Sequence, residues 1–229
     1  MIISGFDKLT LTNYPGLVAC TIFTNGCNYK CPFCQNGTLA LGTETNRISE
    51  EEVLEYLILR RKMLDGICIS GGEPTIQKDL KTFIESVKDI GLKVKLDTNG
   101  SNPKVIKDLL DNNLVDYIAM DIKAPFDKYK EITGVKPNID KLKESINLIK
   151  SSNIEHEFRT TIIKEYHTYE DIEEIAKIAD NSPYFIQNFQ DSDNVIKKGL
   201  HGFSDEELEK LDKRINKKHS NAHVRGLKI

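Results

Sequence analysis

Short apolar runs rich in β-branched residues alternate along the chain with amphipathic stretches in which apolar residues recur every three or four positions. The short runs are typical of strands that are buried on both faces of a parallel sheet. The amphipathic stretches have the period of helices that bury one side. Strands are predicted at residues 17–24, 66–70, 92–97, 116–121, 155–163 and 184–189, with residues 222–227 as a candidate for a last short strand.

Local signals mark several helix boundaries. Ser49 with Glu52, and Ser204 with Glu207, have the spacing of capping boxes, in which each side chain satisfies a backbone group at the start of a helix. Gly91 is a typical C-terminal cap. Helices are therefore predicted to begin at residues 49 and 204, and to cover residues 78–90, 103–110, 139–150 and 169–180.

The alternation of strands and helices implies a parallel sheet with helices packed on its outer face. Six such units predict an α/β fold in the form of an incomplete (β/α)6 barrel, a partial TIM barrel, with a doubly wound sheet as the alternative. No linker or low-complexity tract divides the chain, so residues 1–229 are expected to form one domain. In both folds, functional residues gather at the carboxyl ends of the strands.

Charge and hydropathy exclude some classes of function. The 32 basic and 35 acidic residues leave a formal net charge of −3, so no general basic field is available to attract nucleic acid. No apolar run is long enough to span a membrane. The first residues do not have the basic and then apolar pattern of a secretory signal. We therefore expect no membrane or nucleic-acid partner and a cytoplasmic location.

Three of the five cysteines, Cys27, Cys31 and Cys34, fall within eight residues just after the first predicted strand. Disulfides between such near neighbours would be strained, and cytoplasmic thiols stay reduced. This group therefore indicates metal binding or redox chemistry. Cys20 and Cys68 lie in the middle of predicted strands, where a small core residue is the simpler interpretation.

Three thiolates can hold three irons of a four-iron cluster and leave the fourth iron without a protein ligand. A structural zinc site needs four ligands, yet there is no second cysteine pair, and all five histidines lie more than a hundred residues away. An open iron explains three cysteines best. Zinc, and a thiol-redox site that uses only Cys31 and Cys34, remain as alternatives.

The Cys-x3-Cys-x2-Cys spacing, with the aromatic Phe33 just before the last cysteine, resembles the signature of the radical S-adenosylmethionine (SAM) superfamily. Other motifs are similar to those of activating enzymes of glycyl-radical enzymes, and most similar to anaerobic ribonucleoside-triphosphate reductase activating proteins. These motifs are Gly5-Phe6 with Lys8, Asn13-Tyr14-Pro15-Gly16, Gly26-Cys27-Asn28 and Cys34-Gln35-Asn36. The matches run from residue 5 to residue 123, a little over half of the chain.

The resemblance extends to the end of the second predicted strand, where Gly71, Gly72, Glu73 and Pro74 follow. This motif is similar to the one that receives the amino group of the methionine part of SAM. Glycines allow a backbone to approach a ligand closely, and Glu73 complements an ammonium group. Without the resemblance, the tetrapeptide would be interpreted as a turn.

At the ends of the next two predicted strands, Asp97 and Thr98, with Met120 and Asp121, are similar to a monovalent-cation site in the related pyruvate formate-lyase activating enzymes. Hard oxygen ligands suit such an ion. The resemblance further implies that Lys123 supplies positive charge for the carboxylate of SAM. The alternatives are ordinary caps and turns for the aspartates and a solvated lysine.

Several other side chains have weaker claims on the site. Phe33 is expected beside the adenine, because a flat ring favours an aromatic platform. Tyr29 and Lys30, in the cysteine loop, would face the cofactor or a partner. The strand residues Arg159, Thr160 and Gln187 would reach the site if they point inward, but ordinary strand packing is the alternative. His223 and Arg225 are candidates for a position at the substrate opening.

The resemblance implies a [4Fe–4S] cluster that cleaves SAM reductively to a deoxyadenosyl radical, which then installs a glycyl radical on an anaerobic ribonucleotide reductase. It also implies a flavodoxin- or ferredoxin-type electron donor. The alternatives are another glycyl-radical enzyme as target, a small-molecule substrate such as a deazaguanine-type precursor, and a zinc- or cluster-stabilised binding module without catalysis.

Overall fold

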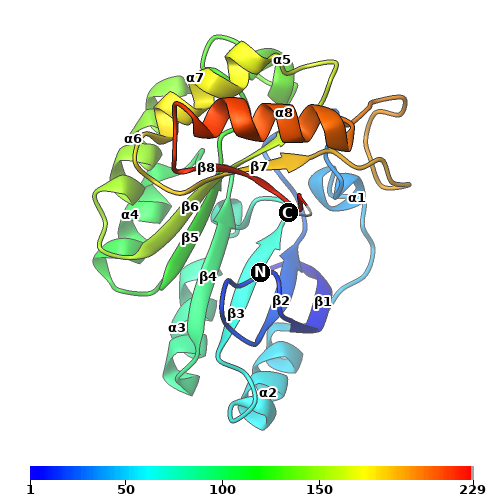
Figure 1. Ribbon diagram of the computed structural model, residues 1–229. Helices are drawn as coiled ribbons and strands as arrows, with labels where there is room; N and C mark the ends of the chain where they lie inside the picture. The colour runs from blue at the N-terminus through cyan, green and yellow to red at the C-terminus, as the bar shows by residue number, and fades with distance from the viewer. Residues whose placement is uncertain (228–229) are drawn as a thin grey trace.

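One eight-stranded sheet, whose strand order follows the chain, organises this computed structural model, which describes residues 1–227 (Figure 1). Strand β1 pairs antiparallel with β2, and every later pair of neighbours is parallel. Strands β1 and β8 are the two edges, so the barrel does not close. The strands are β1 (Ile3–Thr10), β2 (Ala19–Thr24), β3 (Gly66–Gly71), β4 (Lys93–Thr98), β5 (Tyr117–Asp121), β6 (Glu155–Ile162), β7 (Tyr184–Asn188) and β8 (Ala222–Arg225).

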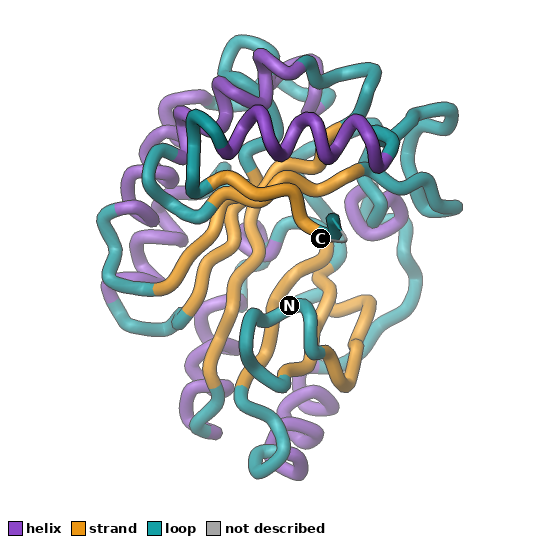
Figure 2. The backbone as a smooth tube through the Cα atoms, in the orientation of Figure 1, coloured by secondary structure: helices purple, strands orange, loops and turns teal. Residues whose placement is uncertain are grey.

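The longer helices lie on the outside of the curved sheet (Figure 2). In chain order, the helices are α1 (Gly37–Ala40), α2 (Glu50–Arg60), the 3-10 helix η1 (Pro74–Ile76), α3 (Leu80–Ile90), α4 (Pro103–Asp111), α5 (Tyr129–Thr133), α6 (Ile139–Lys150), α7 (Tyr169–Ala179) and α8 (Asp205–Asn216). Within residues 1–227, none of them has the length and apolar character that crossing a membrane requires.

The predicted helix boundaries are present, but of the two predicted capping boxes only the one at Ser204 and Glu207 is complete. Ser49 caps α2 by accepting a hydrogen bond from the Glu52 N–H, and Ser204 and Glu207 form a complete capping box at α8. Gly91 ends α3 with a φ of 90°, a left-handed conformation that glycine adopts without strain. The strand order of the sheet confirms the predicted incomplete barrel. The last short strand is also confirmed, as β8.

The sequence analysis missed strand β1, and the sheet has seven parallel strands where six units were expected. Strand β1 is an edge strand whose residues 7–9 are exposed, and its pairing with β2 is interrupted by irregularities on both sides of Gly5–Asp7. An exposed, irregular edge strand lacks the continuous apolar run by which the other strands were identified.

The loop between β1 and β2 fills one end of the barrel with an aromatic side chain. This is the end at which the parallel strands begin. Tyr14 is 2% exposed and packs against Tyr117, with the ring centroids 5.9 Å apart in an edge-to-face arrangement. Ala19 and Ala119 complete this small cluster, which is separate from the main core. Gly66 leaves room for the ring, because a Cβ there would lie 3.1 Å from Tyr14 Cε1. This packed cluster therefore closes the barrel on the side away from the carboxyl ends of the strands.

Replacing Tyr14 with alanine should lower the free energy of unfolding by about 3 kcal/mol, because the lost ring leaves a cavity that its neighbours cannot fill. Tyr14→Phe keeps the ring and should stay within about 1 kcal/mol of the wild type. Urea unfolding of both variants measures the difference. A Tyr14→Ala protein as stable as Tyr14→Phe would show that the ring is not a structural plug.

Candidate active site

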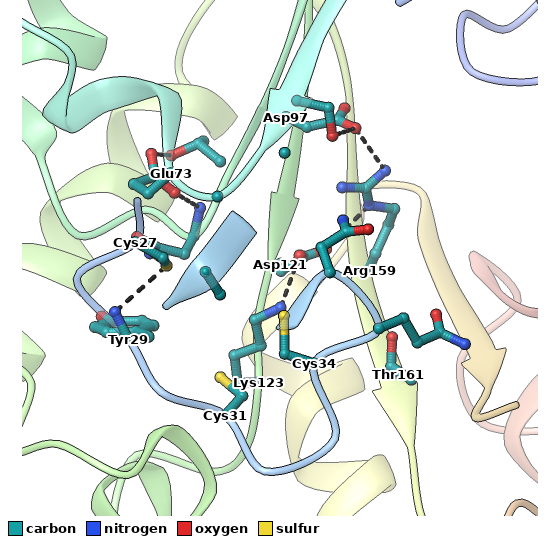
Figure 3. Close-up of a pocket in the computed structure, with 18 of the residues that line it drawn as sticks. Cys27, Tyr29, Cys31, Cys34, Glu73, Asp97, Asp121, Lys123, Arg159 and Thr161 are labelled. Atoms are coloured by element: carbon teal, nitrogen blue, oxygen red, sulfur yellow. Dashed lines mark hydrogen bonds and ion pairs between the residues drawn. The ribbon is translucent and has the colours of Figure 1, made fainter. Parts of the chain in front are cut away.

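A cavity of about 370 Å³ lies where the parallel strands end (Figure 3). Every residue that the sequence motifs predict at the site lines this cavity. These residues are Cys27, Cys31, Phe33, Cys34, Gly71, Gly72, Glu73, Asp97, Thr98, Asp121 and Lys123. Segments that are almost a hundred residues apart in the chain meet here because parallel strands place all their carboxyl ends at one edge.

The loop that carries the three cysteines is held in place by backbone hydrogen bonds to other segments. The Cys27 N–H donates to the Ala40 carbonyl at the end of α1, at 3.1 Å. The Lys30 N–H donates to the Thr133 carbonyl at the end of α5, at 2.8 Å. Pro32 accepts from a loop that follows β7. The position of the cysteine loop is therefore set by bonds to three other segments, two of which are about a hundred or more residues away in the chain.

Burial changes the acidity of these thiols. It raises the pKa of Cys27 to about 12 and the pKa of Cys31 to about 11, and it also raises the pKa of Cys34. Lys123 opposes the shift at all three positions. Because thiolates rather than thiols bind metals, metal binding here must release protons from the protein.

Gly71, the last residue of β3, and Gly72, the next residue, bring that strand against the cysteine loop. Gly71 has a φ of 109°, which disfavours any residue with a side chain. A Cβ at Gly72 would lie 2.0 Å from the Gly26 carbonyl oxygen, so only glycine fits this close approach. The sequence analysis explained the pair by the approach of a ligand, but in the structure the approaching group is the protein's own backbone.

Glu73 is 1% exposed and connects the ends of β3 and β4. Its Oε1 accepts from the Thr75 N–H and hydroxyl and from the Thr98 hydroxyl, and its Oε2 accepts from the Asn99 N–H at 2.7 Å. Burial nevertheless raises the pKa of the carboxyl above its ordinary value. Of the two oxygens, Oε2 has the fewer donors in the part of the chain that the structure describes, and it keeps capacity for another.

Arg159 joins the two aspartates of the site. Its Nε donates to Asp121 at 3.0 Å, and its Nη1 lies 3.5 Å from Asp97 (Figure 3). Lys123 Nζ is 2.8 Å from the second oxygen of Asp121, and Lys95 pairs with Asp97. Asp97 and Asp121 thus share Arg159 as a partner, and each also pairs with a lysine.

These contacts control the acidity of Asp121. Burial would raise its pKa, but Lys123 and Arg159 outweigh burial and hold the pKa at about 2. The pKa of Asp97 is lowered in the same way, against burial, by Arg159 and Lys95. The cavity therefore contains ionised, paired groups of both signs.

Strand periodicity decides which other side chains reach the cavity. Arg159 and Gln187 line it, as an inward orientation requires. Thr160 points the other way and donates its hydroxyl to the Ile122 carbonyl, and Thr161 lines the cavity instead. Adjacent residues of a strand face opposite sides, so Arg159 and Thr160 could not both point inward. The period-two pattern could have identified Thr161.

The remaining candidates are divided. Tyr29 lines the cavity, whereas Lys30 is exposed. Arg225 lines an adjoining cavity of about 200 Å³ and pairs with Glu157, while His223 is exposed. The sequence analysis missed several polar lining residues, namely Asn13, Ser70, Asn99 and Thr161. Asn13, Ser70 and Asn99 lie in or beside motifs that it did single out.

Comparison with known proteins identifies the class. Residues 21–179 match the family model "Radical SAM superfamily". The chain is 40% identical over 198 residues to a Methanocaldococcus jannaschii protein named "Putative glycyl-radical enzyme activating enzyme", covering 84% of this chain and 81% of the relative. It is 28% identical over 138 residues to the pyruvate formate-lyase-activating enzyme of Clostridium pasteurianum, covering 58% of this chain and 57% of that relative.

The fold agrees with this match. The crystal structure of Streptococcus suis SuiB bound to the precursor peptide SuiA superposes with a TM-score of 0.72 at 17% identity. The alignment covers 90% of this chain but 48% of SuiB, so this chain spans about half the length of that structure. The chain belongs to the radical SAM superfamily, whose members use a [4Fe–4S] cluster and SAM.

The residues present fit such a cluster. Soft thiolate donors select iron–sulfur clusters, and Cys27, Cys31 and Cys34 all line one cavity. Cys20 and Cys68 are fully buried in β2 and β3 and do not line it. A cluster held by the three loop cysteines would therefore keep one iron without a protein thiolate. Within residues 1–227, no three His, Cys, Asp or Glu side chains are close enough together to hold a single metal ion.

Replacing Arg159 with methionine should lower the free energy of unfolding by about 3 kcal/mol at neutral pH, because Asp97 and Asp121 would lose their shared partner. The sign follows from the lowered pKa values. Stability from Asp121 is complete above its ordinary pKa of 3.8 and is lost as the pH falls toward 2. The difference from the wild type should therefore shrink in acid.

Urea unfolding at neutral and acidic pH measures this effect. Arg159→Lys, which keeps a positive charge, is the matched control and should lose less stability than Arg159→Met. An equal loss in both variants, independent of pH, would show that packing rather than charge pairing accounts for the contribution of Arg159.

Proposed function

We propose that this chain is a glycyl-radical enzyme activase that acts in the cytoplasm on an anaerobic ribonucleoside-triphosphate reductase. The observation that carries the activase assignment is the relative that is 40% identical over 84% of this chain, together with the three-cysteine cavity. The choice of reductase rests on the motifs near the N-terminus, from Gly5-Phe6 to Cys34-Gln35-Asn36. When bound, the cluster would supply the one electron that cleaves SAM to methionine and a deoxyadenosyl radical, and hydrogen transfer from the target glycine would give deoxyadenosine and the glycyl radical.

The protein's own residues bind and orient in this proposal. Cys27, Cys31 and Cys34 hold the cluster. The edge of the sheet around Glu73 receives the amino group of SAM, where Oε2 has the fewer donors among the residues described. Lys123 faces the carboxylate of SAM, and its raised pKa, caused by Asp121 against the effect of burial, keeps it charged.

Phe33 is the proposed neighbour of the adenine. It lines the cavity, but its ring also packs against Tyr166 and His167, with both centroids 6.3 Å away. The pair Asp97 and Asp121, with Thr98, remains the proposed site for a monovalent cation. Such an ion would have to compete with Arg159 for the same carboxylates.

Hydrogen abstraction requires close contact and exclusion of water, and acid–base side chains contribute little to it. The sheet does not close between its edge strands β1 and β8. The proposal places the entry of a polypeptide loop of the partner on this side. Gln187 and Arg225 are adjacent in register on β7 and β8 and line the adjoining cavity. A flavodoxin- or ferredoxin-type protein would supply the electron.

The direct test is formation of the glycyl radical. The reconstituted protein is incubated anaerobically with SAM, a one-electron reductant and the purified reductase, and electron paramagnetic resonance is recorded. A glycyl-radical signal that is absent when the reductase glycine is replaced by alanine is the expected result. Chromatography measures deoxyadenosine in the same samples.

Two other results of this experiment would contradict the proposal. Deoxyadenosine without a glycyl signal would overturn the reductase as target and favour another glycyl-radical enzyme or a small-molecule substrate. Absence of both products from a cluster-loaded protein would overturn the radical SAM activity of this chain and favour a binding module.

Alanine at Cys27, Cys31 or Cys34 should abolish cluster binding, because each thiolate holds one iron. Cys20→Ala and Cys68→Ala are matched controls, since both cysteines are fully buried in strands. Iron and acid-labile sulfide per chain, measured after anaerobic reconstitution, should fall to background in the first set and stay at the wild-type value in the controls. Retained iron in all three loop variants would contradict the assignment of the ligands.

A further inference from the structure

The loop between β6 and α7 contains a buried histidine to which the proposed function assigns no role. His167 is 3% exposed, and both ring nitrogens have backbone partners. Nδ1 accepts from the Ile163 N–H at 3.2 Å, and Nε2 lies 2.9 Å from the Lys123 carbonyl oxygen. Both bonds can form together only when the ring is neutral and carries its proton on Nε2. The contacts therefore define the tautomer.

The carbonyl that His167 reaches belongs to a segment that has left the sheet. Strand β5 ends at Asp121, and the Ile122 N–H makes the last backbone–backbone hydrogen bond of this stretch to β6, by donating to the Arg159 carbonyl. The Lys123 N–H then donates to the Tyr129 hydroxyl at 3.0 Å, and its carbonyl accepts from His167. Two side chains thus replace the strand partners of the Lys123 backbone.

The same imidazole also contacts the cysteine loop. The ring of Phe33, between Cys31 and Cys34, meets the ring of His167 edge-on at a centroid distance of 6.3 Å and an angle of 71°. Phe33 is 3% exposed, so this contact belongs to the core. One side chain therefore touches both the loop with the thiols and the turn that carries Lys123.

We propose that His167 is a positioning residue that sets the place of the Lys123 ammonium relative to the cysteine loop. This role rests on the proposed function, in which Lys123 faces the carboxylate of SAM. The ammonium is held 2.8 Å from Asp121 on one side, and the backbone that carries it is held by His167 and Tyr129 on the other. Because affinity depends on preorganised charges, loss of the His167 bond weakens SAM binding.

Two substitutions separate the two bonds of the ring. His167→Asn places an amide oxygen near the position of Nδ1, which keeps the acceptor for the Ile163 N–H but leaves nothing to reach the Lys123 carbonyl. His167→Gln places an amide nitrogen near the position of Nε2, which keeps the donor to Lys123 but loses the acceptor. A role limited to local loop structure and a role in positioning Lys123 therefore predict opposite rankings.

The measurement is the equilibrium dissociation constant for SAM on the cluster-reconstituted protein without reductant, so that no turnover occurs. His167→Asn should raise it about tenfold, the loss of one hydrogen bond to a backbone that positions a charge. His167→Gln should stay within about threefold of the wild type. Iron content and thermal unfolding of each variant show whether the cluster and the fold are retained.

Tyr129→Phe is a second arm that does not depend on the histidine variants folding. It removes only the hydroxyl that accepts from the Lys123 N–H, and it should also raise the dissociation constant for SAM with iron content unchanged. Wild-type affinity in both His167→Asn and Tyr129→Phe, or a greater loss in His167→Gln than in His167→Asn, would overturn the positioning role alone. Failure of the wild type to bind SAM would overturn the proposed function and this inference with it.

Discussion

The close contact between the cysteine loop and the end of β3 is the constraint on which the site depends. Gly72 donates its N–H to the Thr24 carbonyl, and Glu73 donates to the Gly26 carbonyl, at 2.8 and 2.9 Å. A side chain at Gly72 would collide with Gly26, so the contact needs glycine. The loop is anchored at this contact. The carboxylate of Glu73 then binds the Thr98 hydroxyl and the Asn99 N–H at the end of β4. The positions of the thiols, the glycines and Glu73 therefore depend on one another.

Charge pairing determines what the rest of the cavity can contain. Buried ions are costly unless they are paired, and Arg159 satisfies this requirement for Asp97 and Asp121 together. Lys123 is held by Asp121 from the side-chain end and by His167 and Tyr129 from the backbone end. The charged groups of the cavity are thus paired with one another and fixed by the protein's own contacts. Preorganisation of this kind lowers the cost of binding a zwitterionic cofactor.

Strand and helix positions could be predicted where burial is simple. The central strands are buried on both faces and appear in the sequence as continuous apolar runs, and glycine or capping residues mark the helix ends. Strand β1 could not be predicted, because an irregular, exposed edge strand has no continuous apolar run. The short helices α1 and α5 escaped because four or five residues are too few to show a helical period.

The sequence by itself identified which residues meet in the cavity. The spacing of Cys27, Cys31 and Cys34 and the motifs at later strand ends name the cavity lining correctly, because parallel strands bring such ends to one edge. Only the tertiary structure decided how these groups are partnered. Arg159 sits between two aspartates, Gly72 approaches backbone rather than ligand, and His167 reaches Lys123 across 44 residues of chain. Such pairings depend on strand register and on which way each side chain points, and local sequence encodes neither.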